Sequence, residues 1–197
     1  MTIDQLKQGI HKNVVVLFTD IRNFTKMTND LSLDEVMLLL RLYYDEMAGI
    51  ITGNHGIVGS FVGDAIVGYF GLGNSSKEPS EEAARAALEI KEEIRFLNIG
   101  RQLPILNGVG IDKGAVVVGA VCSGNDSQTI VIGSPINKAS RFERLTRTSC
   151  HRIIISKEVY EELSSKTKQE YVNIGNCEVR GFDGLMYLYA DCVVKKS

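Results

Sequence analysis

Short apolar runs along the chain predict strands that end at acidic residues. Residues 14–18 form a continuous apolar run, rich in β-branched residues, that predicts a buried strand ending at Asp20. Residues 57–62 and 65–70 form two more such runs, and Gly63-Asp64 lies between them. A glycine followed by an aspartate between two apolar runs predicts the tight turn of a hairpin. Both aspartates are therefore expected at strand ends that face solvent.

Helical spacing of apolar side chains predicts two long helices and one short helix. The first long helix runs from Leu33 to about residue 51, and Ser32 with Glu35 forms a capping box at its start. The second long helix covers residues 80–97, after a loop rich in glycine, serine and proline. The short helix covers residues 23–29, directly after the first strand.

The second half of the chain continues with strands and shorter helices. The pattern predicts strands at 105–112, 115–121, 128–132 and 152–155, a helix with Ser134 as N-cap and Pro135 as its first residue, a short helix from Lys157, and a terminal hairpin to Val193. The β-α-β-β-α-β order of the first two-thirds favours an α+β fold, a ferredoxin-like α/β sandwich.

Composition narrows the class of protein. The 197 residues suit a single domain, residues 1–197 with a core at about 13–193, and 44% hydrophobic with 23% charged residues is typical of globular chains. The net charge of −2 gives no basic footprint, so we expect no nucleic-acid partner. The chain shows no apolar run of membrane-spanning length and no signal-peptide pattern at its start, so we expect a cytoplasmic protein without a membrane partner.

The cysteines and histidines show no ligand spacing. The four cysteines are predicted to be reduced thiols, and a zinc site is not expected. The three histidines are interpreted as surface or loop residues. These residues are Cys122, Cys150, Cys177 and Cys192, and His11, His55 and His151.

Asp20 and Asp64 are the first candidates for chemistry. Two carboxylates held at strand ends and brought together would form an oxygen-rich site suited to Mg²⁺ or Mn²⁺ with a polyphosphate. Taken singly, each has an equally good structural explanation, because Asp20 could cap the following helix and Asp64 could serve only as a turn residue.

A third segment favours the metal-site explanation of the two aspartates over the structural one. Residues 130–141 read IVIGSPINKASR, a strand that leads into a helix start. Asn137 and Arg141 are four residues apart, so they share one helix face. An amide beside a guanidinium suits a phosphate on which negative charge develops.

Together these segments resemble the class III nucleotidyl cyclases, the family of adenylate and guanylate cyclases. The family pattern is roughly F-x-D-[IV]-x-x-F-T, then K-x-x-G-D, then T-V-x-G-x-x-V-N-x-A-x-R. The chain has FTDIRNFT at 18–25, SFVGD at 60–64 and the 130–141 segment in the same order and spacing. The sequence GIDKGAVVVG at 110–119 also matches a strand pair of the family. The resemblance extends from about residue 13 to the end.

The resemblance implies a homodimer with its active sites across the interface. One protomer would supply Asp20, Asp64 and the Ile21 carbonyl to two divalent ions per site, and the other would supply Asn137 to the ribose and Arg141 to the α-phosphate. The backbone N–H groups of the next four residues would cradle the β- and γ-phosphates. Those four residues are Arg22, Asn23, Phe24 and Thr25. Arg180 falls where the family often has a triphosphate-binding lysine, and a solvated charge at a sheet edge is an equally good explanation for it.

The chain departs from the family pattern at the two positions that recognise the purine base in the family. Ser60 replaces the lysine or glutamate of the first reader position, and Ile130 replaces the polar residue of the second. Tyr44 and Arg41 add bulk and charge on the long helix near the expected base, unless they are only a core residue and a solvated charge. Three explanations stay open: an inactive domain, a cyclase with loose purine selectivity, or a cyclase for another base.

This combination looks most like the pyrimidine cyclases of bacterial Pycsar-type antiphage systems. That resemblance implies conversion of UTP or CTP to a cyclic monophosphate that signals to a downstream effector, with UTP favoured. The alternatives are an adenylate or guanylate cyclase with an unusual base pocket, and a cyclase-homology domain without turnover.

Overall fold

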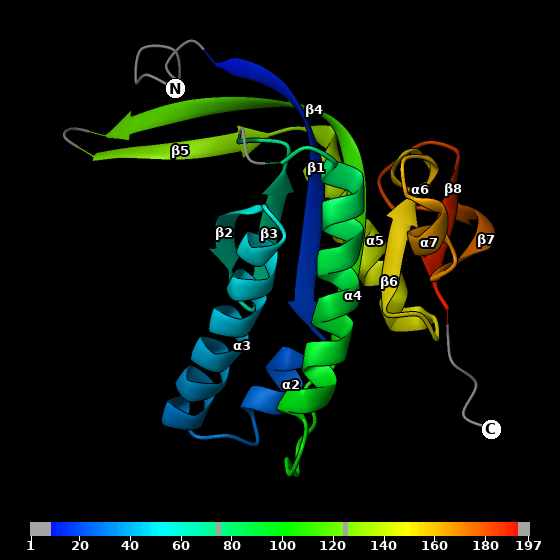
Figure 1. Cartoon of the computed structure of the whole chain (residues 1–197). Coiled ribbons are helices and arrows are strands. Elements are labelled where there is room, and N and C mark those ends of the chain that lie inside the picture. Colours follow the sequence, from blue (N-terminus) through cyan, green and yellow to red (C-terminus); the bar gives the residue numbers. More distant parts are fainter. Residues whose placement is uncertain (1–8, 74–75, 124–125, 193–197) are drawn as a thin grey trace.

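The computed structural model describes residues 9–73, 76–123 and 126–192. These residues form one eight-stranded sheet in the order β2-β3-β1-β4-β6-β8-β7, with β5 paired to β4 alone (Figure 1). The strands are β1 (Ile10–Ile21), β2 (Ile57–Val62), β3 (Ala65–Phe70), β4 (Asn107–Ser123), β5 (Asp126–Ile132), β6 (Ile153–Ser156), β7 (Tyr171–Glu178) and β8 (Leu185–Asp191). The helices are α2 (Phe24–Thr28), α3 (Leu33–Gly53), α4 (Pro79–Leu97), α5 (Ser134–Leu145), α6 (Lys157–Glu161) and α7 (Ser165–Lys168), with a 3₁₀ turn η1 (Thr146–Thr148).

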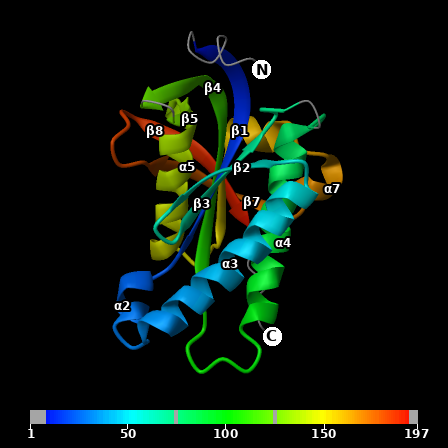
Figure 2. The ribbon, with the colours of Figure 1, turned by 90° about the vertical axis from the view of Figure 1, so that its left-hand side faces the viewer.

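Alternation along β1 separates the two faces of the sheet. Val15 and Leu17 point into the main core, which α3 and α4 cover, whereas Val14 and Val16 belong to a second cluster that includes Ala139 of α5. Figure 2 shows α3 and α4 crossing one face of the sheet, with α5 lying beyond it. This architecture confirms the predicted α+β fold, a sheet with helices packed on it.

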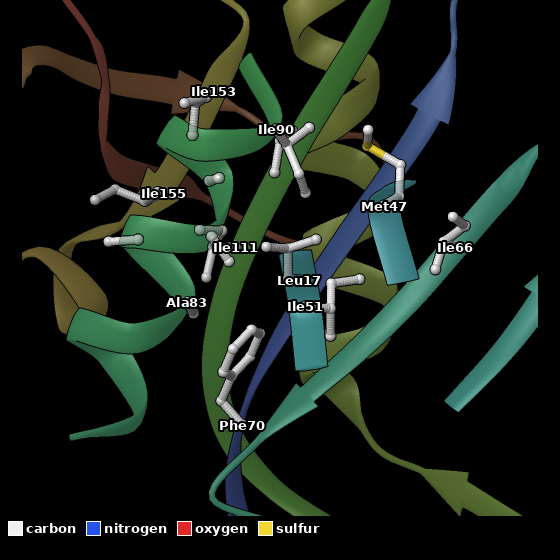
Figure 3. Packing of buried hydrophobic residues seen from close by; sticks show 14 of the residues in the cluster. Leu17, Met47, Ile51, Ile66, Phe70, Ala83, Ile90, Ile111, Ile153 and Ile155 are labelled. Atoms are coloured by element: carbon white, nitrogen blue, oxygen red, sulfur yellow. The ribbon is translucent and has the colours of Figure 1, made fainter. Parts of the chain in front are cut away.

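The main core is closely packed between the sheet and the two long helices. Leu17 and Ile111 of the sheet lie against Met47 and Ile51 of α3 and against Ile90 of α4, and these five side chains are fully buried (Figure 3). On α4, four buried alanines allow the helix to lie close to its neighbours: Ala83, Ala84, Ala86 and Ala87. Burial of this apolar surface fixes the strands that carry the site.

The sequence prediction of two strands at 105–112 and 115–121 is wrong, because β4 is continuous. Gly114 and Lys113 stay in register with Val14 and Val15 of β1, so the antiparallel ladder runs through the expected turn. Gly114 serves helix packing instead: a Cβ there would lie 2.9 Å from Cγ of Pro135.

Glycines on one face of β4 let α5 approach the sheet. A Cβ at Gly110 would lie 2.0 Å from the carbonyl oxygen of Ala139, and one at Gly108 would lie 2.2 Å from Oγ1 of Thr146. The helix start therefore lies beside Gly114, and its far end lies beside Gly108. Since Gly108 is the register partner of Asp20, the end of α5 reaches the end of β1.

Most other predicted elements are confirmed with small changes. The hairpin at 57–62 and 65–70 and the Ser32–Glu35 capping box are as predicted. The helix α5 begins at Ser134 and has Gly133 as its N-cap, so the prediction of Ser134 as N-cap is wrong by one residue. A Cβ at Gly133 would lie 2.6 Å from the Ala115 carbonyl, which explains the glycine there. The sequence pattern does not predict α7, and Val193 lies outside the described residues.

Two further expectations concern the membrane and the cysteines. No helix in the described part of the chain is long and apolar enough to cross a membrane. Cys150, Cys177 and Cys192 are free thiols, as predicted, and the side chain of Cys122 lies outside what the structure describes.

Candidate active site

The structure brings Asp20 and Asp64 to one pocket. Asp20 is the penultimate residue of β1, and Asp64 lies in the turn that joins β2 to β3, the strand next to β1. The pocket has a volume of about 470 Å³. Its lining consists of Asp20, Ile21, Asn23, Phe24, Thr25, Lys26, Asn29, Asp64 and Arg147.

The Asp20 carboxyl group affects the ionisation of Asp64. Partial burial raises the pKa of Asp64 to about 7, and the nearby carboxyl group and negative charge of Asp20 add to the increase. Two neighbouring carboxylates repel each other when both are ionised, so Asp64 holds a proton as the pH falls below about 7. A divalent cation would replace that proton and allow both groups to ionise.

The donor set fits a hard divalent cation. Atom Oδ1 of Asp20 is buried and has no hydrogen-bond partner among the described residues. Carboxylate oxygens are the ligands that Mg²⁺ and Mn²⁺ prefer. The described residues contain no cluster of three or more His, Cys, Asp or Glu side chains, so carbonyl, water or phosphate oxygens must complete the coordination. Ile21 lines the pocket, and its carbonyl as a ligand stays a prediction.

Arg147 is a pocket residue that the sequence reasoning missed. Its Nη2 donates to Oδ2 of Asp20 at 2.6 Å, and its Nε donates to Oε1 of Glu143 at 3.3 Å. Glu143 and Arg147 are four residues apart, so helical spacing could have indicated the pair. Their approach to Asp20 depends on the glycine face of β4, which no local pattern shows.

Three of the four residues of the predicted phosphate cradle line the pocket, and the cradle stays a prediction. The backbone N–H of Arg22 donates to the Leu106 carbonyl at 2.6 Å, and its guanidinium donates to the His151 carbonyl at 2.9 Å. The Arg22 N–H that the cradle would use is therefore already bonded in this structure, and Arg22 is absent from the pocket lining. Asn23, in the left-handed conformation at φ 57°, precedes α2 and lines the pocket together with Phe24 and Thr25.

Tyr44 and Tyr43 of α3 hold the two segments that carry the aspartates, the turn before Asp64 and the end of β1. The Tyr44 hydroxyl donates to the Gly63 carbonyl in the turn before Asp64, and its ring centroid lies 4.7 Å from that of Phe61. Tyr43 is fully buried, and its hydroxyl lies 3.0 Å from Oγ1 of Thr19. Tyr44 therefore contributes to the position of the turn, whatever its role toward a base.

The remaining predicted site residues lie outside this pocket. Asn137 is exposed and Arg141 half-buried on the first turns of α5, between Gly114 and Gly108 of β4. Arg180 is exposed in the β7–β8 loop, where a second pocket of about 750 Å³ opens. The strand pairing puts this loop at the end of the sheet away from Asp20. The start of β6 pairs with Val109 of β4, next to the partner of Asp20, and it lies beside the end of β8 at Ala190. The loop before Leu185 therefore lies at the opposite end of the sheet. Ser60 and Arg41 are exposed, and Ile130 is half-buried on β5.

Comparison with known proteins gives the family. A model of the adenylate and guanylate cyclase catalytic domain matches residues 6–190, which is most of the chain. The chain belongs to this family. It is therefore a nucleotidyl cyclase catalytic domain, as the motifs around Asp20, Asp64 and Asn137 predict.

Two relatives of this cyclase domain are named adenylate cyclases. It is 32% identical over 158 residues to an adenylate cyclase of Anabaena cylindrica, covering 78% of this chain and 31% of that protein. It is 28% identical over 187 residues to the terminal-differentiation specific adenylate cyclase of Dictyostelium discoideum, covering 93% of this chain and 9% of that protein. The chain thus spans less than a third of each of these relatives.

Solved structures of cyclase domains share the fold over nearly the whole chain. The guanylyl cyclase Cya2 superposes with a TM-score of 0.81 at 27% identity, covering 95% of both chains. The guanylate cyclase domain of RhGC from Catenaria anguillulae, solved in complex with GTP, superposes with a TM-score of 0.80 at 26% identity, covering 94% of this chain and 100% of that one. Cyclase domains of this kind use nucleoside triphosphates and divalent cations.

Proposed function

We propose that two copies of this domain form a metal-dependent cyclase for pyrimidine nucleoside triphosphates, with UTP preferred over CTP. The observation that carries the cyclase chemistry is the meeting of Asp20 and Asp64 in one polar pocket. The reaction joins O3′ of the ribose to the α-phosphorus and breaks the bond from that phosphorus to the β-phosphate oxygen. Pyrophosphate leaves, and the hydroxyl proton passes to solvent.

The residues of the chain have separate tasks in this reaction. Bound Mg²⁺ or Mn²⁺, two ions per site, would supply Lewis acidity that lowers the pKa of the 3′-hydroxyl and offsets charge on the triphosphate. Asp20 and Asp64 hold these ions with both carboxylates ionised, helped by the Ile21 carbonyl. Asn23, Phe24 and Thr25 lie where the β- and γ-phosphates would be held. Asn137 orients the ribose, and Arg141 stabilises negative charge on the α-phosphate.

A homodimer follows from the separation of these groups. Asn137, Arg141 and Arg180 do not line the pocket that holds Asp20. A second copy that presents the start of its α5 would bring Asn137 and Arg141 to the pocket, and its Arg180 to the triphosphate. Large apolar side chains exposed on β2 and α3, including Phe61, Val62 and Leu38, support an interface on this side of the sheet.

The base preference rests on four residues. Ser60 and Ile130 lack the purine-reading groups of the family. Tyr44 is held at the Gly63 turn by its hydroxyl and at Phe61 by its ring, so it cannot easily make room for a larger base. Arg41 is exposed on the preceding turn of the same helix. A guanidinium only donates hydrogen bonds, which suits the two carbonyl groups of uracil better than the amino group of cytosine.

The product would serve as a second messenger for a downstream effector of antiphage defence in the cytoplasm, which is what the resemblance to Pycsar-type cyclases implies. The names of the relatives favour a second candidate function, the cyclisation of ATP or GTP in an unusual base pocket. A domain without turnover is a third, and the presence of Asp20, Asp64, Asn137 and Arg141 argues against it.

One assay separates these candidates. The protein is incubated with ATP, GTP, CTP or UTP and Mn²⁺, the products are identified, and kcat/KM is measured for each. We expect UTP or CTP to exceed both purines by about tenfold or more, the scale at which lost polar contacts and poor fit discriminate. The double variant Ser60→Lys with Ile130→Thr should raise any ATP activity. A purine as best substrate would overturn the pyrimidine proposal, and no product from any nucleotide would overturn the cyclase proposal.

A further inference from the structure

Arg147 bridges two acidic residues in the pocket. Its guanidinium contacts Oδ2 of Asp20 through Nη2 at 2.6 Å and both carboxylate oxygens of Glu143 at 3.3 and 3.4 Å. The Glu143 side chain is 2% exposed, whereas that of Arg147 is 36% exposed at the pocket wall. The buried carboxylate therefore anchors one side of the guanidinium and leaves the other side facing the pocket.

The contact with Asp20 conflicts with a cation at the same carboxylate. A guanidinium has N–H donors and no lone pair, so it cannot share a metal site, and its charge repels a cation. Oδ2 of Asp20 is the oxygen it holds, while Oδ1 is buried without a partner. Because its charge repels a divalent ion bound at Asp20, we expect Arg147 to give up this hydrogen bond when the ion binds.

The tether to Glu143 limits where the released guanidinium can go. It remains at the wall of a pocket that Asn23, Phe24 and Thr25 also line. Among the bonds that the structure describes, Nε and Nη2 are used and Nη1 donates none, so its N–H groups are free for another acceptor. Phosphate oxygens are the acceptors that a guanidinium fork binds best.

We propose that Arg147 exchanges partners during substrate binding: it leaves Asp20 when the divalent ion enters and donates to a triphosphate oxygen. The exchange couples the two ligands. Each would bind more tightly in the presence of the other, by the same factor, because thermodynamic coupling is reciprocal. This inference rests on the proposed function in one respect, the binding of a divalent ion by Asp20.

The test measures binding, so it needs no turnover. Affinity for Mn²⁺ alone is measured by electron paramagnetic resonance of the unbound ion, and affinity for inorganic tripolyphosphate is measured by calorimetry at saturating Mn²⁺. Arg147→Gln should bind Mn²⁺ about three- to tenfold more tightly, because it removes a competing, partly exposed ion pair. The same variant should bind tripolyphosphate about tenfold more weakly. Arg147→Lys should lie between wild type and Arg147→Gln in both measurements.

Controls make the two possible failures distinguishable. Arg144→Gln removes an exposed arginine of α5 that lies outside the pocket lining, and it should leave both affinities unchanged. Asp20→Ala should weaken Mn²⁺ binding; if it does not, the metal site of the proposed function is wrong. If Asp20→Ala weakens Mn²⁺ binding but Arg147→Gln does not tighten it, the exchange alone is overturned.

A merely structural role for Arg147 predicts a different pattern. Removing the arginine leaves Glu143 buried without its counter-ion, which destabilises the fold. In that case Arg147→Gln would lose affinity for both ligands together and melt at a lower temperature. The double variant Glu143→Gln with Arg147→Gln removes both charges and keeps this location neutral. We expect it to retain the fold and to show the same opposite shifts, and parallel losses in both affinities would overturn the exchange.

Discussion

The two groups of predicted catalytic residues differ in the contacts that they make within one chain. Asp20 and Asp64 line one pocket, Arg147 holds Asp20 there, and Tyr44 fixes the turn between β2 and β3. The side chains of Asn137 and Arg141, by contrast, make no hydrogen bond or ion pair with the other described residues. The first group is a pocket within the chain, and the second is a surface that requires an opposing one.

This difference shows which catalytic residues are positioned by the fold of a single chain. The aspartates lie at the ends of strands whose neighbours are fixed by a buried core, so one copy of the chain sets their separation. The amide and the guanidinium lie on a helix that approaches the sheet through glycines but shows its polar face to solvent. Their separation from the aspartates would be set by the contact between two copies.

The largest effect is expected at the pocket. Asp64→Ala or Asp20→Ala should lower kcat/KM by about a thousandfold or more, because each removes a ligand of the catalytic cation. Neither side chain belongs to the apolar core, so circular dichroism and the melting temperature should show an intact fold. The control Asp45→Ala, an exposed acid on α3, should keep wild-type activity. Near-normal turnover by Asp64→Ala would contradict the metal assignment.

Mixing variants of the two groups tests whether the sites are shared. Asp20→Ala and Arg141→Ala proteins should each be inactive alone. Random pairing at equal concentrations makes half of the dimers mixed, and each mixed dimer has one site free of both substitutions. Activity should therefore recover to about a quarter of the wild-type value. Failure to recover, once subunit exchange is verified with differently tagged copies, would mean that each site is built within one chain.

Local sequence patterns predicted the features that depend on short-range interactions. The hairpin around Asp64 was predicted correctly because its two strands are apolar and Gly63 adopts a positive φ of 63°. The capping box at Ser32 is likewise a short-range hydrogen-bond pattern. The approach of Asp20 to Asp64 was suggested by the family resemblance and agrees with the pairing of β1 with β3.

Other features depend on contacts between distant segments. Gly114 looked like a turn because its packing against Pro135 is invisible in the sequence. Arg22 looked like a phosphate ligand because its bond to Leu106 joins residues far apart in the chain. Arg147 was missed for the same reason, since its position beside Asp20 follows from the path of α5 across β4. Sequence patterns thus predicted the carboxylates and not the charge that neutralises them.

The glycines on one face of β4 allow the packing of α5 to be tested by measuring the free energy of unfolding. Gly110→Ala should reduce the free energy of unfolding by about 3 kcal/mol, because the added Cβ would clash with the α5 backbone at Ala139. Gly49→Ala provides a matched control within α3, where a Cβ meets nothing within 4 Å. It should stabilise by about 0.5–1 kcal/mol through helix propensity. Urea unfolding measures both, and equal effects of the two substitutions would refute the close approach of α5.

The smallest effect concerns the proton that Asp64 holds. The pKa of Asp64 is about 7 in the folded protein, raised mainly by burial from an ordinary value of 3.8. Between these two values the folded chain holds a proton that the unfolded chain has lost. This group therefore stabilises the fold at low pH, and its contribution decreases as pH rises toward about 7.

The variant Asp64→Asn tests this pH dependence because it removes the titration. It should melt a few degrees higher than wild type near pH 8 and show a smaller difference near pH 5. Mn²⁺ should raise the melting temperature of wild type at pH 8 and have little effect on the variant, because the cation binds the ionised pair. Thermal melts of both proteins at the two pH values, with and without Mn²⁺, give the answer. A difference in melting temperature between the two proteins that stays constant from pH 5 to pH 8 would show that Asp64 does not hold this proton.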